Sequence, residues 1–330
     1  VMDATVSASA LPRNPSIKVG GAKRLERHNG LFRALTLTSA IFVLLTFVGM
    51  FAELFRGAWP AFRHFGLDFF ITQAWNPVKE RFGILAPIGG TLITSALAML
   101  LAVPVGIGIA IFLTEICPRP LRRPVGIAIE LLAGIPSIIY GIWGLFVFAP
   151  MLQTYVQPFL SDTLGEVPLI GFLFQGPPLG VGMLTAGIIL SIMVLPFITS
   201  VMRDVFETVP TVLKESAYGI GATTFEVVWN IVLPYTRTGV IGGIMLGLGR
   251  ALGETMAVTF VIGNAHQFMT SLLAPGTTIS ATLANEFSEA DTPMYLSVMF
   301  ALGLILSVIT LLVLAAAKFM LIRMERQGGT

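Results

Sequence analysis

The sequence has few of the residues that form disulfide frameworks, metal sites or hydrolytic centres. It contains one cysteine, Cys117, and three histidines, at positions 28, 64 and 266. One cysteine excludes an internal disulfide framework, and histidines this far apart lack the spacing of metal ligands. No Ser/His/Asp set indicates hydrolysis, and the phosphate-binding motif G-x-x-x-x-G-K-[ST] is missing. We therefore expect this chain to bind no cofactor or metal and to be no enzyme, so any energy from ATP reaches it through another protein.

Charged residues are scarce as well. They make up 12% of the 330 residues, whereas hydrophobic residues make up 55%. The charged share is about half of that in an average soluble domain, which indicates a membrane protein. Apolar runs that are long enough to cross a bilayer, on the order of 20 residues, lie at residues 31–54, 84–114, 124–150, 180–202, 237–263 and 294–321. The sequence thus predicts an all-α polytopic membrane protein with six transmembrane helices in one domain, residues 31–322.

Lysine and arginine are divided unequally between the segments outside these spans. One side of the membrane receives fifteen of them, in the N-terminal arm up to Arg33, the loop 115–123, the segment 203–237 and the C-terminal end from Lys318. The other side receives four, all in the segment 55–83, and none in the loops 151–179 and 264–293. Because basic loops stay in the cytoplasm, we expect a cytoplasmic N-terminal arm (1–30), loop (203–236) and C-terminal tail (323–330).

Two kinds of segment are predicted on the outer side of the membrane. Residues 55–83 are rich in aromatic side chains, which form either an interfacial amphipathic helix against lipid or a docking surface for another protein. The loops 151–179 and 264–293 carry acidic residues without basic ones: Asp162, Glu166, Glu286, Glu289 and Asp291. These side chains either contact a soluble external partner or form a solvated face.

The loop 203–236 contains two short amphipathic helices. In the first, apolar and small residues recur at helical spacing, at Val209, Val212, Leu213, Ser216, Ala217 and Ile220. Gly219 and Gly221 then allow the left-handed backbone that ends the helix and turns the chain. Thr223, followed three residues later by Glu226, predicts a capping box at the start of the second helix.

The second helix has an apolar face of its own. Phe225, Val228, Trp229 and Val232 form this face, and we expect Pro234 to end the helix. Two helices this short cannot bury their apolar faces against each other. Either the pair lies flat on lipid head groups, or another protein covers it.

The same loop resembles a family signature. Glu215-Ser216-Ala217, then Gly221, then Ile231-x-Leu233-Pro234 follow the "EAA…G…I-x-LP" pattern of binding-protein-dependent ABC importer permeases, with Ser216 in place of the usual alanine. In this family the EAA loop docks into a groove on a cytoplasmic ATPase. The resemblance implies coupling to such an ATPase through Glu215, Ala217, Gly221, Phe225, Trp229, Ile231, Leu233 and Pro234.

One predicted span carries two ionisable residues. Arg250 falls at the midpoint of the run 237–263, and Glu254 follows at i, i+4, on the same helix face. An arginine at this depth costs on the order of 3 kcal/mol to insert, so we expect it to face the bundle interior, a water-filled path or a partner chain. Either the two residues form a structural ion pair, or Arg250 lines a passage where its planar guanidinium binds an oxyanion.

Glycines recur in the same run. Gly239 and Gly243, like Gly249 and Gly253, are four residues apart, a spacing typical of closely packed membrane helices. They predict a packing seam, either within this bundle or against a second transmembrane subunit.

A wider resemblance covers most of residues 30–325. Residues 193–264, the stretch IPSIIYGIWGLFVFAP and the stretch PGTTISATLANEFSEA are similar to the C-subunit family of bacterial phosphate-specific ABC transporter permeases. The resemblance implies a type I ABC importer permease (MetI-like) fold in the bacterial plasma (inner) membrane, which moves inorganic phosphate by alternating access. It also implies that Arg250 and Glu254 form the substrate pathway, whereas the residues alone indicate only an anion.

The same resemblance implies a set of partners. They are a homologous second permease, two copies of a cytoplasmic ATPase that binds ATP and Mg²⁺, and an external phosphate-binding protein, beside membrane lipid; no nucleic acid is expected. Two other classes of function stay open from the residues: an ion-coupled secondary transporter, with polar groups in several spans, and a membrane sensor without transport. On the loop alone, permeases for sulfate, molybdate or phosphonate fit as well.

Overall fold

The computed structural model describes residues 19–168, 170–268 and 271–328. The first part of the predicted N-terminal arm, residues 1–18, and the last two residues of the predicted tail lie outside this description. The chain divides into two units, Val1–Glu53 and Leu54–Thr330. Within the described residues, six helical stretches are long and apolar enough to cross a membrane: Asn29–Phe65, Leu85–Ile116, Ser137–Leu164, Met183–Glu207, Thr224–Leu252 and Pro293–Arg323. The predicted helical class with six spans is confirmed, although three spans differ clearly from their predicted bounds: the first helix runs on to Phe65, and the third and fifth are shifted along the chain.

The described part of the first unit belongs to one helix, α1 (Val19–Phe65), which ends in the second unit. Side chains from residue 29 to residue 50 are all exposed, and the run is apolar, as the predicted span 31–54 requires. Within the described part of its own unit nothing packs against this apolar helix, and its composition suits a position in lipid or against other helices.

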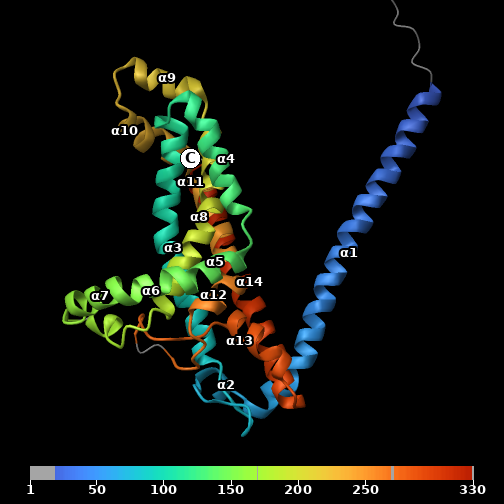
Figure 1. Cartoon of the computed structure of the whole chain (residues 1–330). Coiled ribbons are helices and arrows are strands. Elements are labelled where there is room, and N and C mark those ends of the chain that lie inside the picture. The colour runs from blue at the N-terminus through green and yellow to red at the C-terminus, as the bar shows by residue number, and fades with distance from the viewer. Residues whose placement is uncertain (1–18, 169, 269–270, 329–330) are drawn as a thin grey trace, which may run out of the picture. The chain divides into compact units, whose positions relative to one another are not determined.

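The second unit is built around α8 (Met183–Glu207). In its most apolar stretch 67% of the residues are buried, and it packs along α3 (Leu85–Ile111), α11 (Leu233–Leu252) and α4 (Arg119–Ala133). Figure 1 shows these helices gathered along one direction. The core between them is aliphatic and rich in small side chains, among them Ala98, Ala102, Ile189, Ile198 and Met202. Small side chains let membrane helices approach closely, so that their backbones pack in van der Waals contact.

The predicted glycine seam lies within this bundle. Gly239, Gly243 and Gly247 face α8, where a Cβ on any of them would lie 2.7 to 2.9 Å from a side chain (Val205, Met202 and Ile198, respectively). Gly249 instead faces Leu314 of α14 (Pro293–Gly328), 3.3 Å from the position of a Cβ. The seam therefore holds α11 against helices of its own chain.

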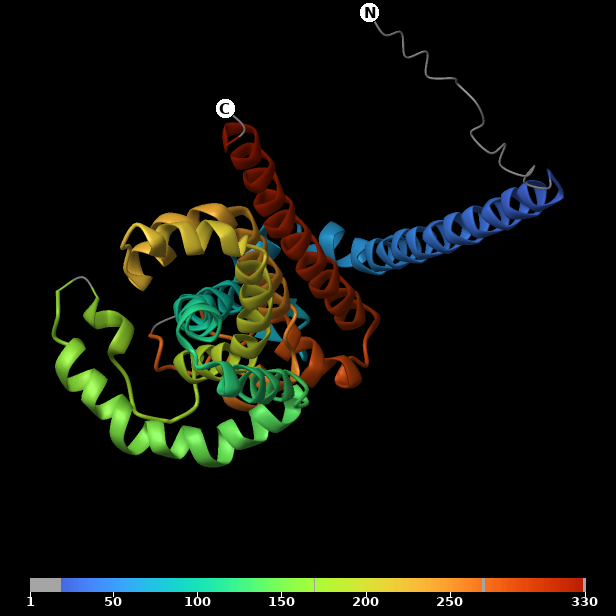
Figure 2. The same ribbon diagram turned by 90° about the horizontal axis from the view of Figure 1, so that it is seen from above.

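The third span differs from the predicted run 124–150. α4 ends at Ala133, and after a break a continuous helical stretch runs to Leu164 through α5 (Ser137–Trp143), η2 (Gly144–Phe148), α6 (Ala149–Met151), η3 (Leu152–Val156) and α7 (Gln157–Leu164). Pro136 causes the break, because it lacks an N–H and restricts the residue before it to extended backbone. Seen from above, the stretch from α5 to α7 forms an arc that runs roughly perpendicular to the axis of α3 (Figure 2).

The fifth span differs from the predicted run 237–263. α10 (Thr224–Val227) continues through the π-helical turn η5 (Val228–Val232) into α11, so the expected helix end at Pro234 is wrong. We attribute this to the wider turn of η5, which directly precedes Pro234 and makes room for its ring. The helix ends instead at Leu252, and α12 (Met256–Val261) begins after a break at Gly253, a residue with weak helix propensity.

The remaining elements lie mostly at the end of the unit opposite α9 and α10. They are α2 (Asp68–Ile71), the antiparallel strands β1 (Trp75–Asn76) and β2 (Arg81–Phe82), the turns η1 (Phe112–Ile116), η4 (Gly171–Phe174) and η6 (Phe287–Glu289), and α13 (Ile279–Glu286). The turn η1 is the exception, because it continues α3 and lies at the same end of the unit as α9.

The aromatic segment 55–83 packs on itself and on α14. Phe69 and Phe82 are buried, and Phe65 packs against both of their rings, at centroid distances of 5.5 and 6.2 Å. The end of α1 is fixed to α14, because Ser297 Oγ donates to the carbonyl of Gly57 at 2.7 Å. Part of this segment therefore forms a packed base, whereas Trp59 and Phe70 stay exposed, at 54% and 39%.

Candidate functional site

A glycine turn between two short helices forms one end of the second unit. α9 (Thr211–Gly219) ends in a Schellman motif, in which the N–H of Ala222 donates to Ala217 O and the N–H of Gly221 donates to Tyr218 O, both at 3.0 Å. Gly221 has φ +91°, a left-handed conformation that costs a residue with a Cβ about 1–2 kcal/mol. The predicted turn at Gly221 is confirmed, whereas Gly219, which was expected to share this role, is the last residue of α9.

The predicted capping box fixes the start of the second helix. The N–H of Glu226 donates to Thr223 Oγ1 at 3.4 Å, and the N–H of Thr223 donates to Glu226 Oε2 at 2.8 Å. Two otherwise free N–H groups are thus satisfied. The turn is ordered on both sides, so α9 and α10 are held as a rigid pair.

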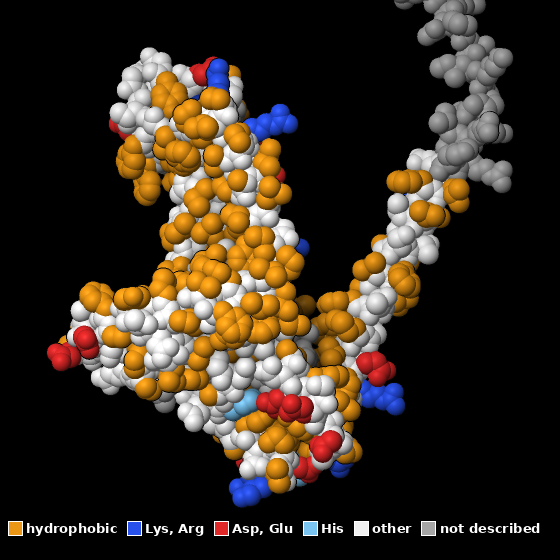
Figure 3. Space-filling view, in the orientation of Figure 1, with side chains coloured by type: hydrophobic (Ala, Val, Ile, Leu, Met, Phe, Trp, Pro, Cys, Tyr) orange, Lys and Arg blue, Asp and Glu red, His pale blue; other side chains and the backbone are white. Residues whose placement is uncertain are grey.

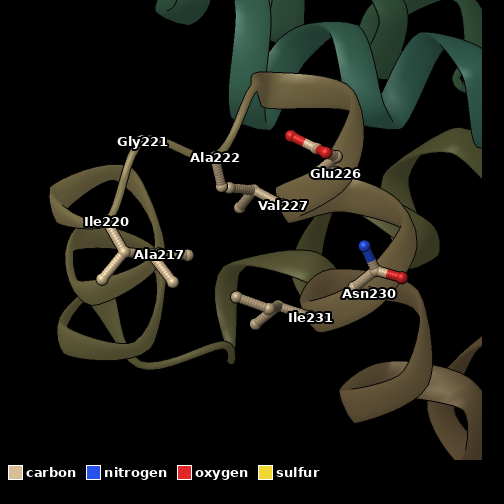
Figure 4. A pocket seen from close by; sticks show the side chains of 8 residues that line it. All are labelled: Ala217, Ile220, Gly221, Ala222, Glu226, Val227, Asn230 and Ile231. Carbon is tan, nitrogen blue, oxygen red and sulfur yellow. The ribbon is translucent and has the colours of Figure 1, made fainter.

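An open hollow of about 400 Å³ lies between the two helices (Figure 4). Its lining residues are Ala217, Ile220, Gly221, Ala222, Glu226, Val227, Asn230 and Ile231. Figure 4 shows side chains of both helices bordering the same space. A concave surface with mostly apolar walls and a few polar groups is suited to receive a protruding side chain of another molecule. Ala217, Gly221 and Ile231 were predicted as coupling residues, and the structure brings them together here.

The apolar side chains beside this hollow are uncovered. Ile220 is 88% exposed, Val212 67%, Phe225 72% and Trp229 62%, and the rings of Phe225 and Trp229 stack with centroids 6.1 Å apart. We call these four residues the apolar cap; Figure 3 shows hydrophobic side chains on the surface at this end of the unit, as along the rest of it. A group of exposed apolar side chains of this kind marks a contact with a protein or a membrane.

The other predicted coupling residues take different positions. Glu215 is exposed on α9, and Pro234 is exposed in the first turn of α11. Leu233 is half-buried, while Val228 and Val232 from the predicted apolar face are buried in the unit. The face predicted for the second helix is therefore divided, with the valines packed inside and the aromatic rings left outside.

A contact that the sequence does not reveal fixes α9 to a membrane span. Lys214 Nζ lies 2.6 Å from Oε1 of Glu115, which belongs to η1 at the end of α3. The side chains of Lys214 and Glu115 are only 17% and 5% exposed. Removing one partner of a buried ion pair leaves an unpaired charge with a large desolvation cost. The pair therefore resists separation and joins α9 mechanically to α3.

We expect Lys214→Met to destabilise the packing of α9 by about 3–5 kcal/mol, because it leaves the Glu115 carboxylate buried without a partner. Amide hydrogen exchange of residues 211–219 should then be at least about a hundredfold faster. The double variant Lys214→Met with Glu115→Leu removes both charges and should return exchange to within about tenfold of the original rate. Equally fast exchange in the single and double variants would show that this pair does not hold α9.

Arg250 and Glu254 do not share a helix face, contrary to prediction. Arg250 is exposed in the last turn of α11, and its Cζ lies 5.7 Å from the ring centroid of Phe197 on α8. Glu254 lies in the break after α11, where its Oε1 accepts a hydrogen bond from the N–H of Ala257 at 3.3 Å. The i, i+4 placement is wrong because the helix ends at Leu252, between the two residues.

The exposure of Arg250 excludes one of the three surroundings that were predicted for it. It does not point into the interior of its own unit, and within the described part of the chain no ion pair joins it to Glu254. Of the three settings predicted for an intramembrane arginine, a water-filled path and a partner chain remain.

At the opposite end of the unit, the carboxylate of Glu286 contacts side chains from three separate segments. Glu286 Oε2 accepts hydrogen bonds from Trp75 Nε1, at 2.7 Å, and from the hydroxyl of Tyr295. His266 stacks on Trp75 with centroids 4.3 Å apart, and its Nε2 lies 3.3 Å from Glu286 Oε1. Glu286 is therefore held inside this cluster, whereas Asp162, Glu166, Glu289 and Asp291 of the predicted acidic loops are exposed.

Burial shifts the pKa values of His266 and Glu286 in opposite directions. It lowers the pKa of His266 to about 4, and it raises the pKa of Glu286 despite the hydrogen bonds from Tyr295 and Trp75. Between pH 4 and 6.5 the unfolded chain protonates His266 while the folded chain does not, so this residue makes stability rise with pH. Above pH 4.5 the folded chain keeps the proton on Glu286 longer than the unfolded chain, so this residue makes stability fall with pH.

We therefore expect a weak pH dependence of Tm between pH 4.5 and 6.5, because the two slopes oppose each other. In Glu286→Gln only the slope of His266 remains, and stability should drop by up to about 3 kcal/mol as the pH falls through this window. In His266→Gln the slope should have the opposite sign. Thermal unfolding of the purified protein at several pH values measures this, and parallel curves for the two variants would contradict the assignment.

Comparison with known proteins identifies relatives of almost the full length. Residues 102–326 match the family described as binding-protein-dependent transport system inner membrane component. The phosphate transport system permease protein PstC of Mesorhizobium japonicum is 61% identical over 320 residues, which covers 97% of this chain and 98% of the relative. The protein of the same name from Xylella fastidiosa (strain 9a5c) is 55% identical over 324 residues, or 98% of this chain and all of the relative.

Solved structures share the fold. A chain of a bacterial alginate ABC transporter, solved in complex with an alginate pentasaccharide-bound periplasmic protein, aligns with a TM-score of 0.60 at 21% identity. The alignment covers 92% of this chain and 97% of that chain. It confirms the predicted ABC importer permease fold. This chain therefore belongs to the family of binding-protein-dependent transport system inner membrane components and groups with the phosphate transport system permease proteins among them.

Proposed function

We propose that this chain is the membrane-spanning permease subunit of an ATP-driven importer that carries inorganic phosphate across the bacterial plasma membrane. The names of its relatives, at 61% and 55% identity, support phosphate as the substrate. The observation that carries the proposal is the apolar cap on a rigid turn, joined without interruption to the helix that contains Arg250. A cytoplasmic ATPase docks on this cap, and α9 to α10, like both chain termini, lies in the cytoplasm.

Coupling follows from the two ways in which α9 and α10 are attached. The helical stretch Thr224–Leu252 leads from the capped turn to Arg250, so a push on α10 moves the cytoplasmic half of this span. The buried pair of Lys214 and Glu115 transmits the same push to α3. When ATP closes the ATPase pair, the two helices act as levers and the passage opens to the other side, as alternating access requires.

The passage runs along the exposed side of Arg250. A guanidinium presents a planar fork of donors that matches the oxygens of phosphate. The contact with the ring of Phe197 steadies the charge without neutralising it. Glu254 holds the start of α12 through the N–H of Ala257 and sets the shape of the break next to the passage.

The bare surfaces of the chain indicate its other partners. The uncovered apolar residues of α1 and the exposed Arg250 fit contact with a second, homologous permease, and the assembly takes two ATPase subunits. ATP and Mg²⁺ bind to those ATPases rather than to this chain. A phosphate-binding protein delivers the ion at the outer end, where Glu289 and Asp291 are exposed.

Uptake by the complete complex in proteoliposomes tests this function. We expect labelled phosphate to enter only when ATP is supplied on the side of α9 and α10 and the binding protein on the other side. Uptake that follows a proton or sodium gradient without ATP would identify a secondary transporter instead. An absence of uptake in a complex that hydrolyses ATP would contradict the permease function.

A further inference from the structure

A basic groove lies between α4 and α8, apart from the hollow and from Arg250. Its volume is about 330 Å³, and its lining residues are Arg119, Arg122, Arg123, Ile127, Glu130, Arg203 and Glu207. The groove is at the same end of the unit as α9, because η1, which precedes α4, carries the partner of Lys214. Four guanidinium groups thus meet in one concave surface.

Arg203, on the α8 side of the groove, is already paired with two carboxylates. Arg203 Nη2 lies 2.8 Å from Glu130 Oε1 and 3.2 Å from Asp204 Oδ1. Gly126 of α4 leaves room for this guanidinium, since a Cβ there would be 3.0 Å from Nη1 of Arg203. The ion pair with Glu130 therefore joins α8 to α4, and Arg203 has little capacity left for a ligand.

The other three arginines keep free donors. Arg122 uses Nη2 to donate to the carbonyl of Thr114 at 2.7 Å, while its Nε is buried without a partner in the described residues. Arg119 and Arg123 are exposed and take part in no ion pair within the described chain. Arg203 with Glu130 and Asp204 sums to one negative charge and Glu207 adds another, so the three remaining arginines leave the groove with a net surplus of one positive charge. Its chemistry is that of a phosphate-type oxyanion site.

The apolar neighbours of the groove favour one source of such an anion. Ile127 lines the groove and is 46% exposed, and Leu131, one turn further along α4, is 70% exposed. A free phosphate ion would gain nothing from contact with these two apolar side chains. A phospholipid would place its phosphate among the arginines and lay its acyl chains along Ile127 and Leu131.

We propose that the basic groove binds the head group of an anionic phospholipid of the inner leaflet. The lipid supplies the oxyanion that Arg119, Arg122 and Arg123 lack, and it covers the apolar side of α4. Its orientation in the cytoplasmic leaflet rests on the proposed function, whereas the binding itself does not.

Native mass spectrometry of the complete complex tests the proposal. Complexes released from mixed phosphatidylcholine–phosphatidylglycerol nanodiscs should retain phosphatidylglycerol, and Arg119→Gln with Arg123→Gln should lower this retention roughly thirtyfold. The matched control is Arg33→Gln with Arg323→Gln, which removes two exposed arginines outside the groove and should leave retention unchanged. Size-exclusion chromatography confirms that each variant is assembled.

A second arm distinguishes the lipid from the free ion. In nanodiscs of phosphatidylcholine alone, without ATP, we expect no binding of radiolabelled inorganic phosphate that depends on Arg119 and Arg123. Phosphate binding that the double variant abolishes would assign the groove to the transported ion and overturn the lipid proposal. Equal lipid retention by the double variant and its control would overturn the site altogether. Phosphate uptake is a separate measurement, so the lipid proposal and the transport function can fail independently.

Discussion

Replacing Arg250 by glutamine is expected to abolish ATP-dependent phosphate uptake while the complex remains assembled. On the proposed function, the change removes the positive charge that contacts phosphate in the passage, and losing such a contact reduces the rate by roughly a hundredfold or more. Little stability is lost, because Arg250 is exposed and its contact with Phe197 contributes only about 0.5–1 kcal/mol. Uptake of labelled phosphate into proteoliposomes, with ATPase activity recorded in parallel, measures both effects.

The matched control lies on the same helix. Arg237 is exposed in α11, near its start, so Arg237→Gln removes the same charge at the other end of the helix and should leave uptake within about twofold. If Arg250→Gln transports phosphate at the original rate, Arg250 has no part in the passage. If both variants fail equally, the loss reflects overall charge and the specific role of Arg250 is contradicted.

The double variant Phe225→Ser with Trp229→Ser is expected to release the ATPase from the complex. Buried aromatic anchors at the centre of an interface often contribute about 2 kcal/mol or more each. Removing two of them should weaken binding by roughly a thousandfold, if their contributions add. The fold should persist, because both side chains point away from the core formed by Val227 and Val232. Co-purification of the ATPase with the tagged permease measures this loss.

Phe159→Ser is the matched control for these aromatic residues. Phe159 is 64% exposed, similar to Trp229, but it lies on α7 rather than beside the hollow. The ATPase should stay bound to this variant at the original affinity. Retention of the ATPase by the double variant would mean that the apolar cap is not its docking surface.

The parts of the site that could be predicted are those that short-range interactions determine. Gly221 tolerates a left-handed backbone, and the side chains of Thr223 and Glu226 cap the helix that follows them. Each of these interactions spans only a few residues, so the sequence pattern contains all of its members. The rigid turn was therefore predictable, and so was the presence of apolar faces on both helices.

The breaks inside apolar runs were not predictable in the same way. The runs 124–150 and 237–263 are continuous in composition, and proline and glycine often lie within unbroken membrane helices. Here the helices are interrupted at both places: α4 ends at Ala133, shortly before Pro136, and α11 ends at Leu252, just before Gly253. Whether such a residue ends a helix depends on the helices packed around it.

The long-range contacts could not be predicted from the sequence either. Lys214 and Glu115 are 99 positions apart, and their pairing depends on α9 lying against the end of α3. Which face of α11 packs on α8 likewise decides that Arg250 is exposed. A single sequence contains the glycines that permit close packing, but not the identity of the helix that they face.

Cross-linking from position 225 determines which molecule covers the apolar cap. Cys117 is the only cysteine and is buried, so Phe225→Cys provides a single accessible attachment site for a photoactivatable cross-linker. In native membranes that contain the whole transporter, we expect an adduct between this chain and the ATPase subunit, identified by mass spectrometry. Adducts with lipid alone, while the ATPase is present in the same membranes, would contradict this expectation.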